Sequence, residues 1–145
     1  MERIQKIIFV LFATFIFCPI VVFAGQKDCE NTKIDFNWNP VMDAIIKVES
    51  GGNAKAKRGN SVGVLQITPI LVAECNNILK ARHQNKRYKL SDRWNVAKSK
   101  EMFLLIQSVY NPQNSIEQAI RSWNGGPHYS KRSTERYYKR VIKEL

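Results

Sequence analysis

Residues 39–68, NPVMDAIIKVESGGNAKAKRGNSVGVLQIT, contain the signals from which the fold of this chain is predicted. Asn39-Pro40 is typical of a helix start, with Asn39 as the N-cap and proline at the first helical position. The helical spacing i, i+3, i+4 and i+7 is then occupied by Met42, Ile45, Ile46 and Glu49. This spacing predicts an apolar stripe that ends in a carboxylate. Gly51-Gly52 end the predicted helix directly after it.

Glu49 is unusual because a carboxylate on an apolar stripe loses hydration, which raises its pKa. The negative end of the helix dipole acts in the same direction at a helix C-terminus. Both effects favour a protonated acid near neutral pH, and a protonated carboxyl is what general-acid cleavage of a glycosidic bond requires. The alternative is a glutamate at the edge of the stripe that turns outward to water.

Two later segments place polar or aromatic groups where they could meet a ligand. In Gly63-Val64-Leu65-Gln66-Ile67, the glycine could admit a polymer close to the backbone, and Gln66 lies among apolar residues. A glutamine in that position needs partners, which a sugar hydroxyl, an acetamide or the loop backbone could supply. Trp123, directly before Asn124-Gly125-Gly126, could stack on a sugar ring or pack in the core.

The middle of the chain also has helical periodicity. Thr68-Pro69 predicts a second helix that runs to about Leu79, followed by a basic, polar loop over residues 80–89. A third helix is expected from Ser91-Asp92 or Asn95 to about Tyr110. Its predicted buried face consists of Met102, Leu105, Ile106 and Val109.

The last part of the sequence predicts two further helices. Asn114 and Glu117 form an expected capping box, and the stripe that follows consists of Ile116, Ala119, Ile120 and Trp123. A final short helix is expected from the stripe Tyr138, Val141, Ile142 and Leu145. The sequence contains no sustained β alternation and no internal repeat. These features predict a mainly α fold: one small domain of about five helices with little or no β-sheet.

Residues 1–24 have the pattern of a secretory signal peptide. Arg3 and Lys6 give a basic start, an apolar run follows, and Val22-Phe23-Ala24 offers a cleavage site. The apolar run is also nearly long enough for an uncleaved N-terminal anchor, although Pro19 near its end favours cleavage. Residues 25–37 are interpreted as a polar lead-in and residues 38–145 as the folded domain. An exported protein, periplasmic or secreted, is therefore expected, without a stable membrane span after cleavage.

Removal of Glu2, Arg3 and Lys6 with the signal peptide leaves 21 basic and 11 acidic residues, a formal charge of +10. Such a charge attracts polyanions, and export disfavours nucleic acid relative to anionic lipid or a wall polymer. A solvated basic surface without a partner is the alternative. Cys29 and Cys75 remain as an even pair, which outside the cytoplasm makes them a candidate disulfide. The two histidines lack ligand spacing, so no metal or cofactor is expected.

Three segments in order resemble the motifs of the soluble lytic transglycosylase (SLT) domain: Glu49-Ser50, Gly63-x-Leu65-Gln66-Ile67 and Trp123-Asn124-Gly125-Gly126. That family belongs to the lysozyme-like superfamily, together with goose-type lysozymes, and the resemblance covers about residues 38–142. It implies a lysozyme-like helical domain in which Glu49 is the catalytic acid. The residues assigned to substrate binding are Ser50, Gln66, Trp123, Asn124 and Tyr137.

Two positions depart from the family pattern. Leu65 stands where methionine is common, and Ser122-Trp123 stands where Ala-Tyr is usual. The family tyrosine has a hydroxyl that can orient the catalytic carboxyl, whereas an indole offers only an N–H donor. Tyr137 or Tyr138 in the last helix could supply that hydroxyl instead.

The resemblance implies a reaction that needs one carboxylate and no cofactor. Glu49 protonates the oxygen that links N-acetylmuramic acid (MurNAc) to N-acetylglucosamine (GlcNAc) in peptidoglycan glycan strands. Glu49 then accepts the proton of the muramoyl 6-hydroxyl as a 1,6-anhydro ring closes. Glycoside hydrolases usually need a second carboxylate, and Asp92, Glu74 and Glu101 lack motif support. The alternatives are a hydrolytic muramidase of the same fold, a non-catalytic peptidoglycan-binding module, and a basic exported protein that acts on membranes or nucleic acid.

Overall fold

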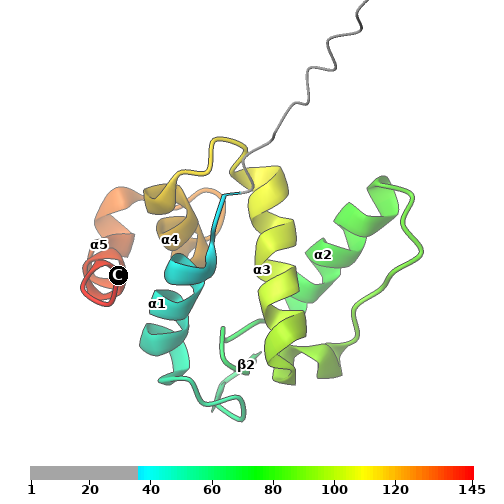
Figure 1. The fold of residues 1–145 in the computed structure, drawn as a ribbon, viewed down its shortest axis with the longest axis horizontal. Coiled ribbons are helices and arrows are strands. Elements are labelled where there is room, and N and C mark those ends of the chain that lie inside the picture. Colours follow the sequence, from blue (N-terminus) through cyan, green and yellow to red (C-terminus); the bar gives the residue numbers. More distant parts are fainter. Residues whose placement is uncertain (1–35) are drawn as a thin grey trace, which may run out of the picture. The chain divides into compact units, whose positions relative to one another are not determined.

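The computed structural model describes residues 36–145 (Figure 1). In chain order, its elements are α1 (Asn39–Ser50), β1 (Lys57–Arg58), β2 (Ser61–Val62), α2 (Pro69–Ala81), the 3-10 helix η1 (Leu90–Trp94), α3 (Val96–Tyr110), α4 (Ile116–Gly125) and α5 (Lys131–Ile142). The described part is therefore mainly helical with one two-stranded sheet, which confirms the predicted fold class. The predictions for the signal peptide, most of the lead-in and Cys29 lie outside the described residues.

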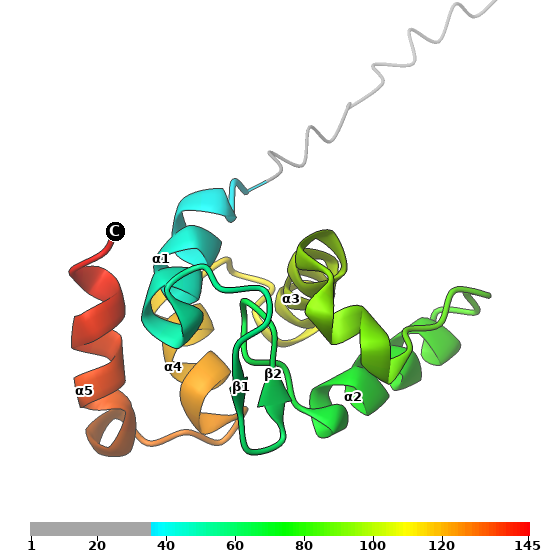
Figure 2. The same cartoon turned by 90° about the horizontal axis from the view of Figure 1, so that it is seen from below.

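The helices form two groups on either side of the β1–β2 hairpin (Figure 2). Helices α1, α4 and α5 lie together on one side, and α2 and α3 lie on the other. Fully buried side chains from both groups and from the loop after β2 meet in one core, among them Ile45, Leu65, Phe103, Ile120 and Val141. Within residues 36–145, no helix combines the length and the apolar character needed to cross a membrane.

Helix α1 ends as predicted but begins one residue earlier. Gly51 has a left-handed conformation with φ 63°, and its N–H donates back into the last helical turn at 3.1 Å. Glycine adopts this conformation without a steric cost, so the helix stops there and leaves Glu49 in its last turn. The N-cap is Trp38 rather than Asn39, because the buried Trp38 anchors the chain and its carbonyl accepts the first helical hydrogen bond at 2.9 Å.

The hairpin β1–β2 is antiparallel, and a bridge between Val62 and Ile67 extends it toward α2. The chain turns at Gly63, whose φ is 76°. A Cβ atom at this position would lie 1.9 Å from the backbone carbonyl oxygen of Arg93 in η1. Glycine is therefore required by packing within the chain, which corrects the expectation that it admits a polymer to the backbone.

Helices α2 and α3 start where the sequence signals predict. The side chains of Thr68 and Asn95 cap them by accepting hydrogen bonds from backbone N–H groups at 3.2 and 3.0 Å. The buried face of α3 differs from the prediction, since Phe103 and Gln107 are buried whereas Val109 is 38% exposed. The ring of Phe103 packs against two tryptophans of the core, and this aromatic cluster sets the rotation of α3.

Helix α4 has Ser115 as its N-cap, and the Ser115 hydroxyl accepts a hydrogen bond from the N–H of Gln118 at 3.2 Å. The predicted capping box at Asn114 is wrong, because Asn114 has a φ of 54° and cannot take the extended conformation of an N-cap residue. The side-chain amide of buried Asn111 instead sets the start of the helix by bonding the N–H and the carbonyl of Ser115 at 2.9 and 2.8 Å.

The buried face of α5 consists of Thr134, Tyr137 and Val141. The predicted stripe is wrong at Ile142 and Leu145, which are 42% and 51% exposed. Hydrophobicity alone selects isoleucine and leucine, but the hydroxyls of Thr134 and Tyr137 have hydrogen-bond partners inside the domain. A satisfied polar group can therefore replace an apolar one on the buried face of a helix.

Arg121 of α4 holds α5 in position. Its guanidinium donates to the Glu135 carboxylate at 2.8 Å, to the Lys131 carbonyl at 2.9 Å and to the Thr134 hydroxyl at 3.1 Å. It also lies 4.2 Å from the ring centroid of Tyr138. Because a guanidinium presents its donors in a rigid plane, these contacts fix both the spacing and the rotation of α5 against α4.

Candidate active site

Glu49 lies at the wall of a pocket of ≈ 250 Å³. The residues that line it are Glu49, Arg58, Ser61, Gln66, Thr68, Leu71, Trp123 and Asn124. They come from the end of α1, the hairpin and its following loop, the start of α2 and the end of α4. The three sequence motifs therefore contribute Glu49, Gln66, Trp123 and Asn124 to one pocket.

The carboxyl of Glu49 is half-buried, and the hydroxyl of Tyr137 donates to its Oε1 at 2.8 Å. Burial raises the pKa of Glu49 and outweighs the Tyr137 hydrogen bond and the charges of Arg58 and Arg140, which lower that pKa. Burial and the Glu49 charge raise the pKa of Tyr137, so its hydroxyl stays a donor at neutral pH. Within residues 36–145, Oε1 is the oxygen of this carboxyl that accepts a hydrogen bond. Oε2 is therefore available to a ligand.

Arg58 and Arg140 are site residues that the sequence did not predict. Arg58 in β1 lines the Glu49 pocket, and Arg140 in α5 donates to the carbonyl of Val48 at 3.2 Å. For Arg140 a signal existed, because it follows Tyr137 by three positions and so lies on the same face of a helix. For Arg58 there was none, because the short hairpin was not predicted.

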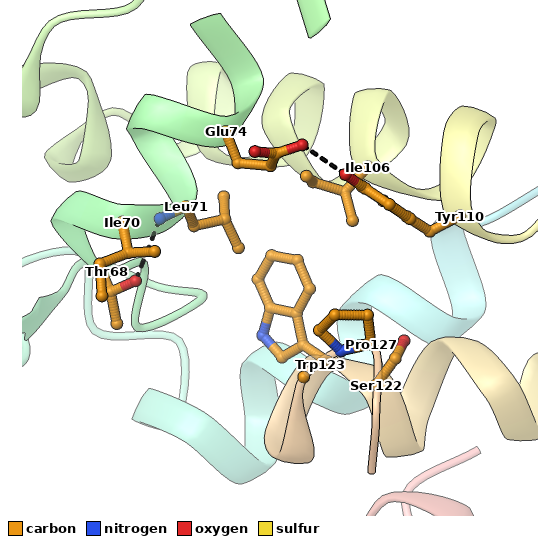
Figure 3. Close-up of a pocket in the computed structure, with 10 residues that line it drawn as sticks. Thr68, Ile70, Leu71, Glu74, Ile106, Tyr110, Ser122, Trp123 and Pro127 are labelled. Atoms are coloured by element: carbon orange, nitrogen blue, oxygen red, sulfur yellow. Dashed lines mark hydrogen bonds between the residues drawn. The ribbon is translucent and has the colours of Figure 1, made fainter. Parts of the chain in front are cut away.

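Trp123 packs in the core on one side and borders the pocket on the other. Its ring contacts Phe103 with centroids 5.0 Å apart, and its indole N–H donates to the carbonyl of Leu65 at 3.2 Å. Figure 3 shows the Trp123 ring directed into the space between α2 and α4. The indole N–H is thus used by the loop backbone, and the hydroxyl that reaches Glu49 belongs to Tyr137.

Gln66 and Ser50 hold the loop over residues 63–67. Gln66 has a φ of 51°, and its Nε2 donates to the carbonyls of Gly63 and Ala56 at 2.9 and 3.2 Å. The Ser50 hydroxyl donates to the carbonyl of Val64 at 2.8 Å and so ties this loop to the end of α1. Gln66 also lines the Glu49 pocket, whereas Ser50 lies outside its lining and acts on the loop backbone.

The remaining predicted residues have different positions. Asn124 is exposed at the end of α4 and lines the Glu49 pocket. Cys75 is buried in α2, where burial raises the pKa of its thiol to about 12; its candidate partner Cys29 precedes the described region. Among residues 36–145, no three His, Cys, Asp or Glu side chains are grouped as metal ligands.

A second pocket of ≈ 400 Å³ is shown in Figure 3. Thr68, Leu71 and Trp123 line both pockets. The second pocket is also lined by Ile70, Glu74, Ile106, Tyr110, Ser122, Gly126 and Pro127. The two pockets therefore adjoin each other along α2 and α4.

Comparison with protein-family models matches residues 30–145 to the Transglycosylase SLT domain. Comparisons with curated proteins and with solved structures gave no match. The matched range contains every residue that lines the two pockets, and the mainly helical fold agrees with it. Because the match covers most of the sequence, the chain belongs to the Transglycosylase SLT domain family.

Proposed function

We propose that this protein is an exported lytic transglycosylase that cleaves the β-1,4 bond between MurNAc and GlcNAc in peptidoglycan and leaves a 1,6-anhydro-MurNAc end. Membership of the Transglycosylase SLT domain family supports action on peptidoglycan. One observation carries the chemistry: Glu49 is a half-buried carboxyl with a raised pKa at a pocket wall, held at one oxygen by Tyr137.

The proposed reaction uses Glu49 first as an acid and then as a base. The protonated carboxyl donates its proton to the glycosidic oxygen, which leaves as the 4-hydroxyl of GlcNAc when its bond to C1 of MurNAc breaks. The MurNAc acetamide supports the positive charge that develops at C1. The Glu49 carboxylate then removes the proton of the 6-hydroxyl while O6 bonds to C1. Glu49 ends the cycle protonated, as it began.

The surroundings of Glu49 suit both steps. Burial favours the protonated carboxyl that the first step needs. Tyr137, Arg58 and Arg140 lower the pKa of Glu49, so they stabilise the carboxylate that exists between the two steps. This balance favours a carboxyl that gives up a proton and recovers one within a single turnover.

We propose the 6-hydroxyl rather than water as the nucleophile because of the number of carboxylates that line the Glu49 pocket. Glu49 is the only carboxylate among the described residues that line its pocket. Glycosidases that use water or a covalent intermediate usually place two carboxyl groups about 5–9.5 Å apart around the bond. A pocket with one carboxylate therefore favours the transglycosylase over the muramidase of the same fold.

Digestion of purified sacculi tests the proposal. The mature protein should release muropeptides with 1,6-anhydro ends, whereas a muramidase would release reducing ends that are heavier by one water, and mass spectrometry distinguishes them. Glu49→Gln keeps the side-chain volume and removes the transferable proton. It should lower product release by at least about 10²-fold while folding and sacculus binding are retained. Glu49→Asp should also be poor, because the shorter side chain withdraws the carboxyl.

Glu144→Gln is the control, because Glu144 is exposed near the C-terminus and should be dispensable for cleavage. Cleavage by Glu49→Gln at more than about a tenth of the wild-type rate would contradict the catalytic role of Glu49. Sacculus binding by both the wild type and Glu49→Gln, without cleavage by either, would favour the non-catalytic peptidoglycan-binding module.

A further inference from the structure

The second pocket has a composition that a sugar chain alone does not explain. Its wall is mostly apolar, and Ile70 at its edge is 81% exposed. Glu74 faces this space from α2, on the side opposite Trp123 (Figure 3). In the part of the chain that the structure describes, Glu74 is the only charged residue of the lining. Uncharged sugar rings offer hydroxyls and acetamides but no positive charge for a carboxylate to bind.

Glu74 has no ion-pair partner within residues 36–145, although Lys and Arg are abundant there. The carboxylates in that range that do pair with Lys or Arg are Asp43, Glu101, Glu117 and Glu135. Glu74 instead accepts hydrogen bonds from the hydroxyl of Tyr110 and, at 3.5 Å, from the side chain of Asn77. Neutral donors orient the carboxylate but leave its charge available to a ligand.

We infer that this pocket binds the peptide stem that branches from the glycan, and that Glu74 binds the free ammonium group of a diamino acid in that stem. The inference rests on the proposed function, which puts the glycan in the adjoining Glu49 pocket. An aliphatic chain that ends in an ammonium group matches an apolar wall that ends in a carboxylate. Thr68, Leu71 and Trp123 border both pockets, so glycan and stem of one strand occupy adjoining pockets.

Three forms of one soluble substrate separate the stem from the glycan. They are strands with intact diamino stems, the same strands with the stem amines acetylated, and strands stripped of stems by an amidase. KM and kcat for anhydro-product formation are measured with the wild type, Glu74→Gln and the control Glu144→Gln. For the wild type, acetylation should raise KM about three- to tenfold and change kcat less, since one partly solvated ion pair is lost.

Glu74→Gln should raise the KM of intact strands by the same factor and should respond no further to acetylation, because both changes remove the same contact. Glu144→Gln should behave as the wild type in every arm. Ile70→Ser tests the apolar wall without disturbing the core, because Ile70 is 81% exposed. It should raise KM for stem-bearing strands and leave stripped strands unchanged.

Two outcomes would overturn the inference. Equal wild-type KM values for intact and acetylated strands would mean that no ammonium group is bound. Stripped strands could also have the same KM as intact strands, and Glu74→Gln the same KM as the wild type. That result would assign the pocket to a further sugar ring.

A binding measurement keeps this test independent of catalysis. The affinity of Glu49→Gln for a soluble stem-bearing muropeptide, with and without an acetylated amine, is measured by calorimetry. The affinity of Glu49→Gln could fall on acetylation while the wild type forms no anhydro product. That result would contradict the proposed function and support the stem pocket. An active enzyme whose affinity ignores acetylation would contradict the stem pocket alone.

Discussion

At the scale of single residues, the Tyr137 hydroxyl acts on Glu49 in two ways. It fixes one carboxyl oxygen at 2.8 Å, and it lowers a pKa that burial has raised. The two residues are 88 positions apart in the sequence, so no local pattern specifies this contact. The effect on orientation and the effect on protonation should both be lost when the hydroxyl is removed.

Tyr137→Phe keeps the ring and removes the hydrogen bond. The pKa of Glu49 should then rise further, because the lost bond stabilised the charged form. The proposed reaction begins with protonated Glu49, so the alkaline limb of the kcat/KM profile should move to higher pH. The plateau should fall roughly 10- to 100-fold because the carboxyl is no longer held in position. Initial rates of anhydro-muropeptide release across the pH range measure both effects.

Tyr138→Phe is the matched control for this change. Tyr138 is the next residue of α5, and its ring stacks on Arg121, while its hydroxyl makes no hydrogen bond within residues 36–145. Its pH profile should coincide with that of the wild type. If the alkaline limb of Tyr137→Phe stayed in place, Glu49 would not be the group that governs it.

At the scale of elements, the loop after β2 depends on its backbone path. Gly63 and Gly59 have φ values of 76° and 59°, so alanine at either position incurs a strain of about 1–2 kcal/mol. A Cβ at position 63 would also lie 1.9 Å from the Arg93 carbonyl oxygen, whereas nothing lies within 4 Å of one at position 59. Gly63→Ala should therefore lower the free energy of unfolding by about 1–3 kcal/mol more than Gly59→Ala does.

Urea denaturation followed by circular dichroism compares the two variants. If both variants lost the same free energy of unfolding, η1 would be able to move away from the new Cβ atom without destabilising the protein. Its contact with the loop would then contribute little to stability. Activity gives a second reading, because Gln66 of this loop lines the Glu49 pocket. Gly63→Ala should reduce cleavage even where the protein stays folded, and Gly59→Ala should not.

The ends of the helices show what local sequence can predict. Gly51 and Thr68-Pro69 mark a helix end and a helix start correctly, because a left-handed glycine and a threonine cap satisfy purely local backbone requirements. The predictions of Asn39 and Asn114 as N-caps were wrong because tertiary contacts decide these helix starts. Burial of Trp38 and the bonds of the Asn111 amide decide where α1 and α4 begin, and both depend on the folded core.

At the scale of the whole molecule, periodicity predicted the helices, and the fold brings motifs that are far apart in the sequence to one candidate pocket. Glu49, Gln66 and Asn124 come from separate motifs and line one pocket. Arg58 could not be found in this way, because a two-residue strand brings it to Glu49 only after folding. Arg140 shares a helix face with Tyr137, but its closeness to Glu49 depends on how α5 packs. The pocket around Glu74 was not predicted for the same reason.

The basic charge of the protein should control how it is held on the wall. The sequence carries a formal net charge of +11, and the Debye length falls from about 30 Å at 0.01 M salt to about 3 Å at 1 M. Binding of Glu49→Gln to sacculi should therefore weaken about tenfold or more between these conditions. A pelleting assay measures the bound fraction, with neutral GlcNAc oligomers as the salt-insensitive control ligand. Unchanged sacculus binding at 1 M salt would mean that contacts in the two pockets dominate.

Tyr137 belongs to α5, which is synthesised well after α1, and this order determines when Glu49 can acquire its hydrogen-bond donor. Synthesis proceeds from the N-terminus at about 5–20 residues per second, so Tyr137 is added roughly 4–18 s after Glu49, which precedes it by 88 positions. Until α5 is complete and docked on α4, the acid exists without the donor that orients it. A copy that ends before Tyr137 lacks the hydroxyl that holds Glu49, so by the proposed mechanism such a copy should cleave poorly.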